Sequence, residues 1–471
     1  MKKYNNGALL ATLLWLLTSP VQAQAPSDLI VYGDYVLTMD LQQPEIRDGA
    51  VVIDSGRIVA VGPRVQIDGE YLANQVIEGS GKVLMPGLIN GHTHTAMTLF
   101  RGMADDLDLM NWLNHYIFPM EARFVDAGFV RTGAELACWE MIRGGTTTFV
   151  DMYFYPDEIA AVVERCGLRA VIAAPHIDYP SPGFKGWDDS FAAAEAFVHR
   201  WQGKNLRITP AFGPHAPYTV IPEHLQATVE KARELSAPVS IHLAEAPTER
   251  EYIAKHYNTT PVQHVQTLGL YDLPLIAAHM VQLDAKDIEL TAAAGVGAVH
   301  NPGSNMKLAA GVSPVPAMLK AGINVGLGTD GAASNNDLDM WEEIRMAALL
   351  HKVSTGNPSE LPAATALAMA TRMGAQAVHL GHQTGQLKVG MQADMIQVDV
   401  SQLQQQPLYN ITSHLAYVVD SDDVTTTIVA GQILMYERNV LSIDETALRK
   451  AVAAYADKVK AALDEAAQVE K

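Results

Sequence analysis

The sequence predicts an α/β protein, a (β/α)8 TIM-like barrel that carries a small β-sandwich built from the segments on either side of it. Between residues 86 and 384, eight short apolar runs rich in β-forming residues alternate with helical runs. This alternation is typical of parallel strands joined by helical crossovers, and eight such units fit one closed barrel. Short alternating strand patterns at 27–85 and 385–440 predict the sandwich.

The chain begins with a predicted secretory signal peptide, residues 1–23. Two lysines precede the apolar run GALLATLLWLL, and small residues follow in VQAQA. The run is too short for a membrane-spanning helix, which needs about twenty residues. We expect cleavage after Ala23 or Ala25 and export, to the periplasm of a Gram-negative bacterium, with no membrane contact afterwards. An uncleaved membrane anchor is the alternative.

The first flanking segment, 27–85, contains a hairpin pattern, GAVVIDSGRIVAVG, with Ser-Gly at its turn. In the barrel segment, 86–384, the expected strands run from LINGHTHT to INVGLGTDG, and helical runs such as VRTGAELACWEMIRG lie between them. The second flanking segment, 385–440, returns to short strands. The last segment, 441–471, is an alanine-rich amphipathic pattern that predicts a packing helix.

Composition excludes some partners and leaves others open. The 33 basic and 52 acidic residues give a net charge of −19, which argues against nucleic acid as a partner. The oligomeric state stays open, a homo-oligomer included. Cys138 and Cys166 both lie in apolar helical stretches, which favours buried, inert thiols, although export would permit a bridge.

Polar residues interrupt the apolar strands near their carboxyl ends, where the catalytic face of such a barrel lies. The stretch PGLINGHTHT places His92 and His94 two residues apart, on one face of a strand. Each such residue has a structural alternative, such as a satisfied core histidine or a helix cap. Their recurrence at the ends of several strands instead predicts a shared site, made of His92, His94, His242, Glu245, His279 and Asp330.

Three histidines and one aspartate form a suitable ligand set for one divalent metal ion, with Zn²⁺ expected and Fe²⁺ as the alternative. We expect His92, His94, His242 and Asp330 to bind the ion. A bound ion lowers the pKa of its water, and Asp330 can accept the proton. His279 is expected to orient the resulting hydroxide and Glu245 to act as the general acid. The strand AVIAAP has no lysine to bridge a second ion, so the site is expected to be mononuclear.

These motifs resemble the amidohydrolase superfamily over nearly the whole mature chain: PGLINGHTHT, HLAE, AAHM and GTDG. Three longer segments, around FPMEARF, FGPHAPYT and GTDGAASNNDLDMW, resemble its methylthioadenosine/S-adenosylhomocysteine deaminases, in the branch of the triazine hydrolases. The resemblance implies hydrolytic deamination of an adenine nucleoside (methylthioadenosine, S-adenosylhomocysteine or adenosine) to the inosine-type product and ammonia.

The resemblance also assigns substrate contacts. It implies that Glu121 binds the ribose hydroxyls, that His215 contacts the substrate near base and ribose, and that Trp112 lines or stacks on the nucleoside, with Glu245 and Asp330 completing the pocket. Without it, Glu121 would be taken for a solvated helix residue. For Trp112, a place in the plain hydrophobic core stays open as the alternative.

Two features depart from the family. Its substrates are chiefly cytosolic metabolites, whereas this chain carries an export signal. The loop HIDYPSPGFKGWDDSF has Lys185 but no arginine to bind the carboxylate of S-adenosylhomocysteine, which favours methylthioadenosine or adenosine. Three alternatives stay open: a deaminase or hydrolase of another heterocycle (a guanine-like base, a pterin or a triazine), a catalytically silent binding protein, and a two-metal peptidase-like enzyme.

Overall fold

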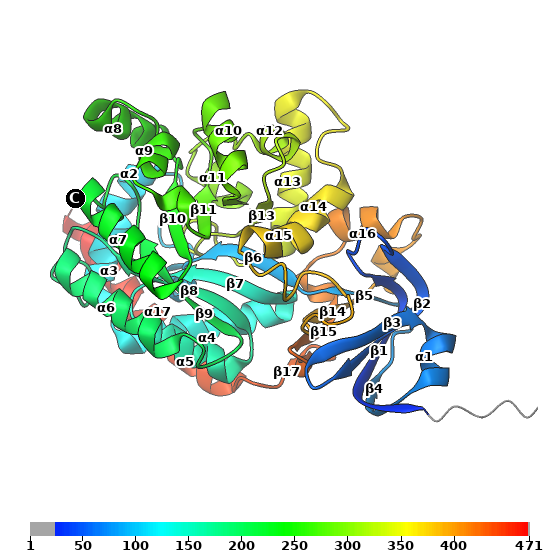
Figure 1. Cartoon of the computed structure of the whole chain (residues 1–471). Coiled ribbons are helices and arrows are strands. Elements are labelled where there is room, and N and C mark those ends of the chain that lie inside the picture. Colours follow the sequence, from blue (N-terminus) through cyan, green and yellow to red (C-terminus); the bar gives the residue numbers. More distant parts are fainter. Residues whose placement is uncertain (1–23, 470–471) are drawn as a thin grey trace, which may run out of the picture.

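The computed structural model describes residues 24–469, with side chains to residue 465; the predicted signal peptide, 1–23, lies outside the described residues. Within this range the chain forms an eight-stranded parallel barrel and a separate nine-stranded mixed sheet (Figure 1). The predicted fold class is confirmed. Between residues 24 and 469, no helix combines the length and the apolar character needed to cross a membrane.

The barrel strands pair in chain order, each parallel to the next. The first and last strands meet where the amide of Asp330 donates to the carbonyl of His92, at 2.9 Å. Every residue of the second and third strands is buried, as expected for strands with helices outside and packed side chains inside. The strands are β6 (Leu88–Thr93), β7 (Thr146–Met152), β8 (Arg169–His176), β9 (Ile208–Pro214), β10 (Val239–Leu243), β11 (Leu275–His279), β12 (Gly297–His300) and β13 (Val325–Leu327).

Helices surround the strands (Figure 1), and local sequence fixes where many of them begin. Proline occupies the first turn of α5, α7, α8 and α9, where its missing N–H has no helical partner to lose. The outer helices are α4 (Ala127–Gly144), α5 (Pro156–Cys166), α6 (Trp187–Trp201), α7 (Pro222–Leu235), α8 (Pro247–Tyr257), α9 (Pro261–Thr267), α10 (Ala285–Ala294), α11 (Pro302–Lys307), α12 (Val315–Lys320), α13 (Met340–Thr355), α14 (Ala363–Met369) and α15 (Arg372–Ala377).

A helical insertion follows β6 before the chain reaches α4. It contains a 3-10 turn, η1 (Thr95–Phe100), then α2 (Leu109–Trp112), a π-helical turn η2 (Leu113–Ile117) and α3 (Phe118–Phe124). Asp108 caps α2 by accepting hydrogen bonds from two backbone amides. This insertion supplies one wall of the cavity described below.

The segments before and after the barrel join in one sheet, because β5 pairs antiparallel with β14. The predicted hairpin is present as β2 and β3, and Ser55 and Gly56 at its turn both have positive φ, as a two-residue hairpin turn requires. The strands are β1 (Ala25–Leu37), β2 (Glu45–Asp54), β3 (Arg57–Pro63), β4 (Tyr71–Ile77), β5 (Lys82–Pro86), β14 (Met395–Asp399), β15 (Val424–Val429), β16 (Gln432–Tyr436) and β17 (Asn439–Val440).

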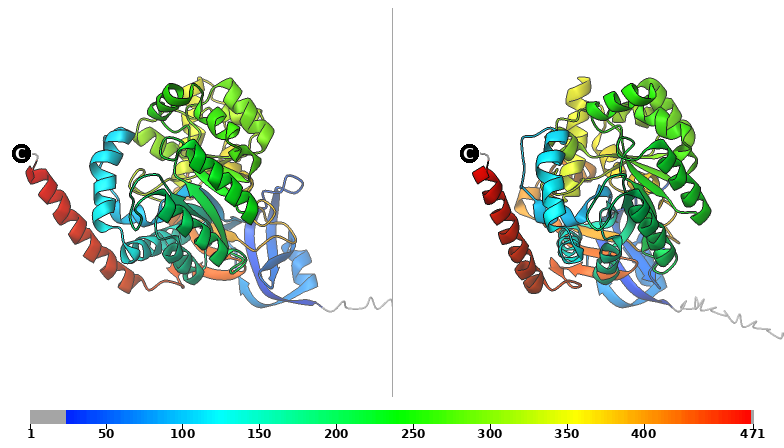
Figure 2. Two further views of the ribbon diagram at one scale, coloured as in Figure 1. Left: turned by 60° about the vertical axis from the view of Figure 1, so that its left-hand side comes forward. Right: turned by 90° about the vertical axis from the view of Figure 1, so that its left-hand side faces the viewer.

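Several contacts attach the flanking regions to the barrel, among them a buried ion pair and an aromatic contact. Arg169 at the start of β8 forms a buried ion pair with Asp394, at 2.7 Å. The last helix, α17 (Glu445–Val469), lies along the outside of the molecule (Figure 2), where the ring of Tyr455 packs against Phe129 of α4. The small helices α1 (Arg64–Glu70) and α16 (Ile411–Tyr417), with the turns η3 (Leu270–Asp272), η4 (Leu403–Gln405) and η5 (Ser421–Asp423), complete the described structure.

Candidate active site

The structure brings together all the polar strand-end residues that the sequence singled out. His92 lies in β6 and His94 directly after it, His242 lies in β10, His279 ends β11, and Asp330 follows β13. All are buried or nearly so. The backbone is left-handed at His279 and Asp330, with φ of 75° and 64°. Such φ values are costly for residues other than glycine and are concentrated at functional sites.

Backbone carbonyls orient two of the histidines. Nδ1 of His94 lies 2.6 Å from the carbonyl of Met152, and Nδ1 of His242 lies 2.7 Å from that of His215. Each Nδ1 therefore donates a proton, and each Nε2 presents its lone pair to the cavity. These two Nε2 atoms face each other at 3.2 Å. Two lone pairs at that distance repel unless a proton or a metal ion lies between them.

Asp330 completes the cluster. Its Oδ1 lies 3.4 Å from Nε2 of His92 and 3.3 Å from Nε2 of His94, while its Oδ2 accepts a hydrogen bond from Ser304. Ligand atoms about 2.0–2.2 Å from one ion lie roughly 3.0–3.6 Å from one another, so these separations fit a shared metal ion. Both ring nitrogens of His92 are buried without a hydrogen-bond partner among the described residues. The donor set thus fits a divalent ion.

The electrostatics of the cluster agree with this fit. Burial lowers the pKa of His92 to about 4, so its imidazole is neutral and able to bind a metal. Burial opposes the charging of His94 as well, but Asp330 and the carbonyl of Met152 outweigh it and raise the pKa of His94 to about 9. The buried carboxylate of Asp330 therefore creates a site that favours a positive charge.

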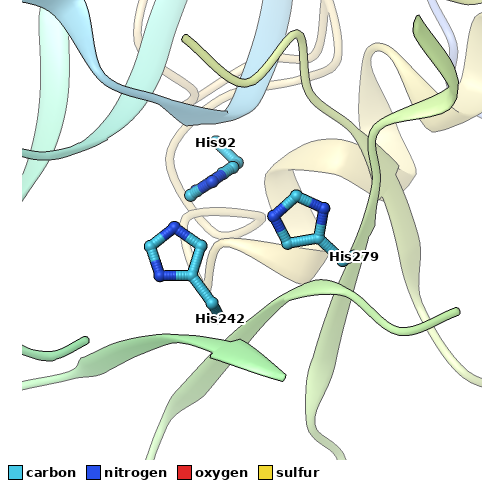
Figure 3. A group of neighbouring side chains, drawn as sticks. All are labelled: His92, His242 and His279. Carbon is cyan, nitrogen blue, oxygen red and sulfur yellow. The ribbon is translucent and has the colours of Figure 1, made fainter. Parts of the chain in front are cut away.

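His279 and Glu245 lie beside the cluster. Figure 3 shows the rings of His92, His242 and His279 facing one another, and one nitrogen of each ring lies within 4.8 Å of one nitrogen of the other two. Nδ1 of His279 lies 2.9 Å from Oδ1 of Asn305, whereas Nε2 lies 3.7 Å from Oε1 of Glu245. Burial raises the pKa of Glu245, which favours the protonated acid.

The cluster lies in a cavity of about 770 Å³. The predicted substrate residues Glu121, His215 and Trp112 all line it. Glu121 is 4% exposed rather than solvated, and the hydroxyl of Tyr153 donates to its Oε1 at 2.8 Å. Burial raises the pKa of Glu121 to about 7, although Tyr153 and His94 lower it. The indole N–H of Trp112 is buried without a partner among the described side chains.

The sequence did not identify the residues that hydrogen-bond to the predicted site residues and so fix their positions. Tyr153 follows β7 and Asn305 lies in α11, so both stand near strand ends, where a systematic search for polar residues would have found them. Glu249 in α8 is different, because it accepts hydrogen bonds from the amides of Ala244 and Glu245, at 2.9 and 2.8 Å. No local pattern separates it from Glu251, the exposed acidic residue two positions later in α8.

Known proteins resemble this chain in sequence and in fold over most of its length. The model of the amidohydrolase family matches residues 83–434. The chain is 46% identical to a 5-methylthioadenosine/S-adenosylhomocysteine deaminase of Pelotomaculum thermopropionicum, over 89% of this chain and 96% of the relative. It is 47% identical to a 5'-deoxyadenosine deaminase of Methanosarcina mazei, over 89% of this chain and 95% of that protein.

The crystal structure of an adenosine deaminase from Xanthomonas campestris, with bound zinc, superposes with a TM-score of 0.91. It is 39% identical to this chain and covers 93% of it, and the whole of that structure is matched. The sequence-based resemblance is therefore confirmed at the level of the family and of its deaminase members.

Proposed function

This chain belongs to the amidohydrolase family, and on that premise we propose that it is a metal-dependent deaminase of adenine nucleosides. The reaction replaces the exocyclic amino group at C6 by oxygen, which gives the inosine-type product and ammonia. The three similar proteins described above are named for 5-methylthioadenosine and S-adenosylhomocysteine, for 5'-deoxyadenosine and for adenosine, all of which carry the same amino group.

The proposal rests on one observation. Residues of the candidate metal site, among them His242 and Asp330, line the same cavity as the carboxyl group of Glu121. The cluster suits hydrolysis, and the buried Glu121 suits a substrate that brings two hydroxyl donors. A ribosyl purine has both parts, an aminated ring for the cluster and vicinal hydroxyls for Glu121. Holding both at once places C6 at the reacting groups, where proximity contributes to the rate.

We assign the ion to His92, His94, His242 and Asp330, and propose zinc. Nitrogen and carboxylate donors suit it, and the adenosine deaminase from Xanthomonas campestris contains it. Such an ion supplies Lewis-acid chemistry that makes water acidic enough to ionise near neutral pH. Asp330 is placed to take the proton that the water loses. With Asn305 bound at Nδ1, His279 directs the lone pair of Nε2 into the cavity, where it accepts a hydrogen bond from the attacking oxygen.

Glu245 performs the complementary proton transfers. In its protonated form it donates to N1 of the purine while oxygen adds to C6, so the ring becomes tetrahedral at C6 without a full negative charge. The proton that Asp330 has taken passes to the exocyclic amine, and the C6–N bond breaks with ammonia as the leaving group. The proton of the hydroxyl group on C6 returns to Glu245, which leaves the C6 carbonyl of the product and a protonated Glu245. Burial of Glu245 favours the protonated form that begins this sequence.

The residues that line the cavity favour a substrate whose 5' substituent on the ribose is uncharged. Among the described residues that line it, none is lysine or arginine, and the charged lining groups apart from histidine are Glu121, Glu245 and Asp330, all acidic. The loop after β8 contributes Tyr179–Gly183, which carry no charge, and Lys185 does not line the cavity. We therefore propose methylthioadenosine, 5'-deoxyadenosine or adenosine as better substrates than S-adenosylhomocysteine, whose carboxylate finds no cation here.

We also propose that the protein acts after export. The amino-terminal pattern of residues 1–23 supports this, and β1 begins at Ala25, so cleavage after Ala23 would leave that strand intact. Cell fractionation with amino-terminal sequencing of the mature protein tests both points. A chain found in the cytosol with Met1 retained would overturn them.

The function is tested by measuring ammonia release from the zinc-replete protein with adenosine, 5'-deoxyadenosine, methylthioadenosine, S-adenosylhomocysteine, guanine, a pterin and a triazine. We expect the nucleosides with neutral 5' groups to give the highest kcat/KM. Higher activity on guanine, the pterin or the triazine would replace the proposal with deamination of another heterocycle. Bound zinc without ammonia release from any of them would favour a silent binding protein.

A further inference from the structure

The two cysteines of the chain meet between two barrel helices. Cys138 lies in the middle of α4 and Cys166 is the last residue of α5, and both side chains are almost fully buried. The thiol of Cys166 donates to the sulfur of Cys138 at an Sγ–Sγ distance of 2.9 Å. A disulfide bond is about 2.05 Å long, so closing the gap requires a movement of less than about 1 Å.

The packing holds both sulfur atoms in place. The guanidinium of Arg207 binds the carbonyls of Val163, Glu164 and Leu168, at 3.4, 3.1 and 2.9 Å, and so fixes the carboxyl end of α5 around Cys166. Cys138 lies on the buried face of α4, in the same core cluster as Ala137. The facing thiols are therefore a property of two packed helices rather than of mobile surface side chains.

We propose that Cys138 and Cys166 form a disulfide bond that links α4 to α5 when the chain folds in an oxidising compartment. The reaction is thiol–disulfide exchange with a disulfide donor, either a protein or a small molecule. Two S–H bonds of the chain and the S–S bond of the donor break, and one S–S bond forms between Cys138 and Cys166. The donor takes up the two electrons and two protons and leaves as two thiols.

The bond forms during folding, before the two helices close over it. The thiolate is the reacting species, and burial raises the pKa of the Cys138 thiol well above its usual value. Once α4 and α5 have packed, the Cys138 thiol is neutral and both sulfur atoms are shielded from a donor. A chain that folds under reducing conditions consequently keeps two free thiols, so the redox state records where folding took place.

The link stabilises a segment that supports the active site. It spans β7, whose end supplies the Met152 carbonyl that orients His94 and the Tyr153 hydroxyl that binds Glu121. Closing a loop of this length restricts the unfolded chain, and we expect Tm of the oxidised protein to exceed that of the reduced protein by about 4 °C. Neither cysteine lines the cavity, so kcat at ambient temperature should be equal in both forms.

The test compares one full-length chain recovered from the periplasm and from the cytosol of a Gram-negative host. Each sample is denatured in N-ethylmaleimide without reductant, weighed by mass spectrometry and digested with trypsin. We expect no maleimide on the periplasmic protein and a cross-linked pair of peptides, 132–143 with 166–169. The cytosolic protein should carry two maleimides. Cys138→Ala, which leaves Cys166 alone, should carry one maleimide from either compartment.

Two maleimides on the periplasmic protein would overturn the proposal. If the chain is not exported, the purified full-length protein is unfolded and refolded with glutathione disulfide and zinc. Formation of the 132–143 to 166–169 link then supports the proposal, and glutathione attached to both cysteines overturns it. These outcomes do not depend on the deaminase activity, so failure of the proposed function leaves this test unchanged.

Discussion

The floor and the mouth of the cavity are built in different ways. The floor, made of His92, His94, His242, His279 and Asp330, comes from the ends of barrel strands or the residues just after them, and nearly every member has a fixed hydrogen-bond partner. The mouth comes from two insertions, 109–118 and 179–183, whose lining side chains are mostly apolar. The barrel itself therefore positions the chemistry, whereas two insertions determine which molecule reaches it.

The largest effect should come from the acid beside the floor. Glu245→Gln removes the proton donor, and we expect kcat to fall by about 10²–10⁴-fold on every substrate. Glu245 is not one of the assigned ligands, so zinc content measured by mass spectrometry should stay near that of the wild type. Asp330→Asn is the contrasting variant and should lose both metal and activity. A Glu245→Gln protein that lost its zinc would place this residue among the ligands instead.

A substitution of Glu121 should reduce kcat/KM for nucleosides more than for a free base. Glu121→Gln replaces a carboxylate that accepts two hydroxyl donors, and charge-assisted hydrogen bonds of this kind support a loss of about 10–100-fold in kcat/KM for nucleosides. Free adenine, which has no ribose, should lose little. Tyr153→Phe removes only the hydrogen bond to Glu121 and should have a smaller effect of the same kind. Equal losses on adenosine and adenine would contradict the role of Glu121.

A change in the mouth should alter selectivity alone. Ser181 lines the cavity, and its hydroxyl has no hydrogen-bond partner among the described residues. Ser181→Arg places a cation near the 5' end of the substrate, and we expect the ratio of kcat/KM for S-adenosylhomocysteine over methylthioadenosine to rise about fivefold, as for a partly exposed ion pair. Ser181→Gln provides a neutral side chain of comparable reach. An equal rise in this variant would show that charge is not the cause.

The smallest effect concerns the stability of the folded protein at low pH, and it depends on the buried His176. His176 is buried beside Trp187, Phe191 and Phe212, and burial lowers its pKa to about 3. The unfolded chain, with a histidine pKa near the usual 6.5, binds this proton first, so the stabilisation is complete above about pH 6.5 and is lost as the pH falls towards 3.

Calorimetry between pH 7 and pH 4.5 checks this prediction. We expect Tm to fall with pH in the wild type and to fall less steeply in His176→Gln, which retains a polar group for Thr228 but has no proton to gain. Zinc release in acid would affect both proteins, and the difference between their slopes isolates His176. Identical slopes would contradict the assignment.

The sequence predicted the residues of the floor better than the residues that hydrogen-bond to them. His92, His242, His279 and Asp330 could be found because each is a polar residue at or near the end of an apolar strand, and strand ends meet in a barrel. Ser304 and Asn305 follow β12 closely enough to be noticed as polar residues near a strand end, but the sequence does not show that they bind Asp330 and His279, which belong to the neighbouring strands. Likewise, Cys138 and Cys166 are 28 positions apart, and nothing in the sequence between them indicates that their sulfur atoms face each other.

The pairing of β5 with β14 has a consequence for how the chain is made. Pro86 and Met395 are partners in one ladder, although the entire barrel lies between them in the sequence. At about 5–20 residues per second, a ribosome needs roughly 15–60 seconds to synthesise the intervening chain, and β5 has no β14 to pair with during that time. The amino-terminal strands therefore wait with an open edge until the barrel has been translated. Such a delay in folding would suit the export proposed above, because a polypeptide passes through a translocation channel before it becomes compact.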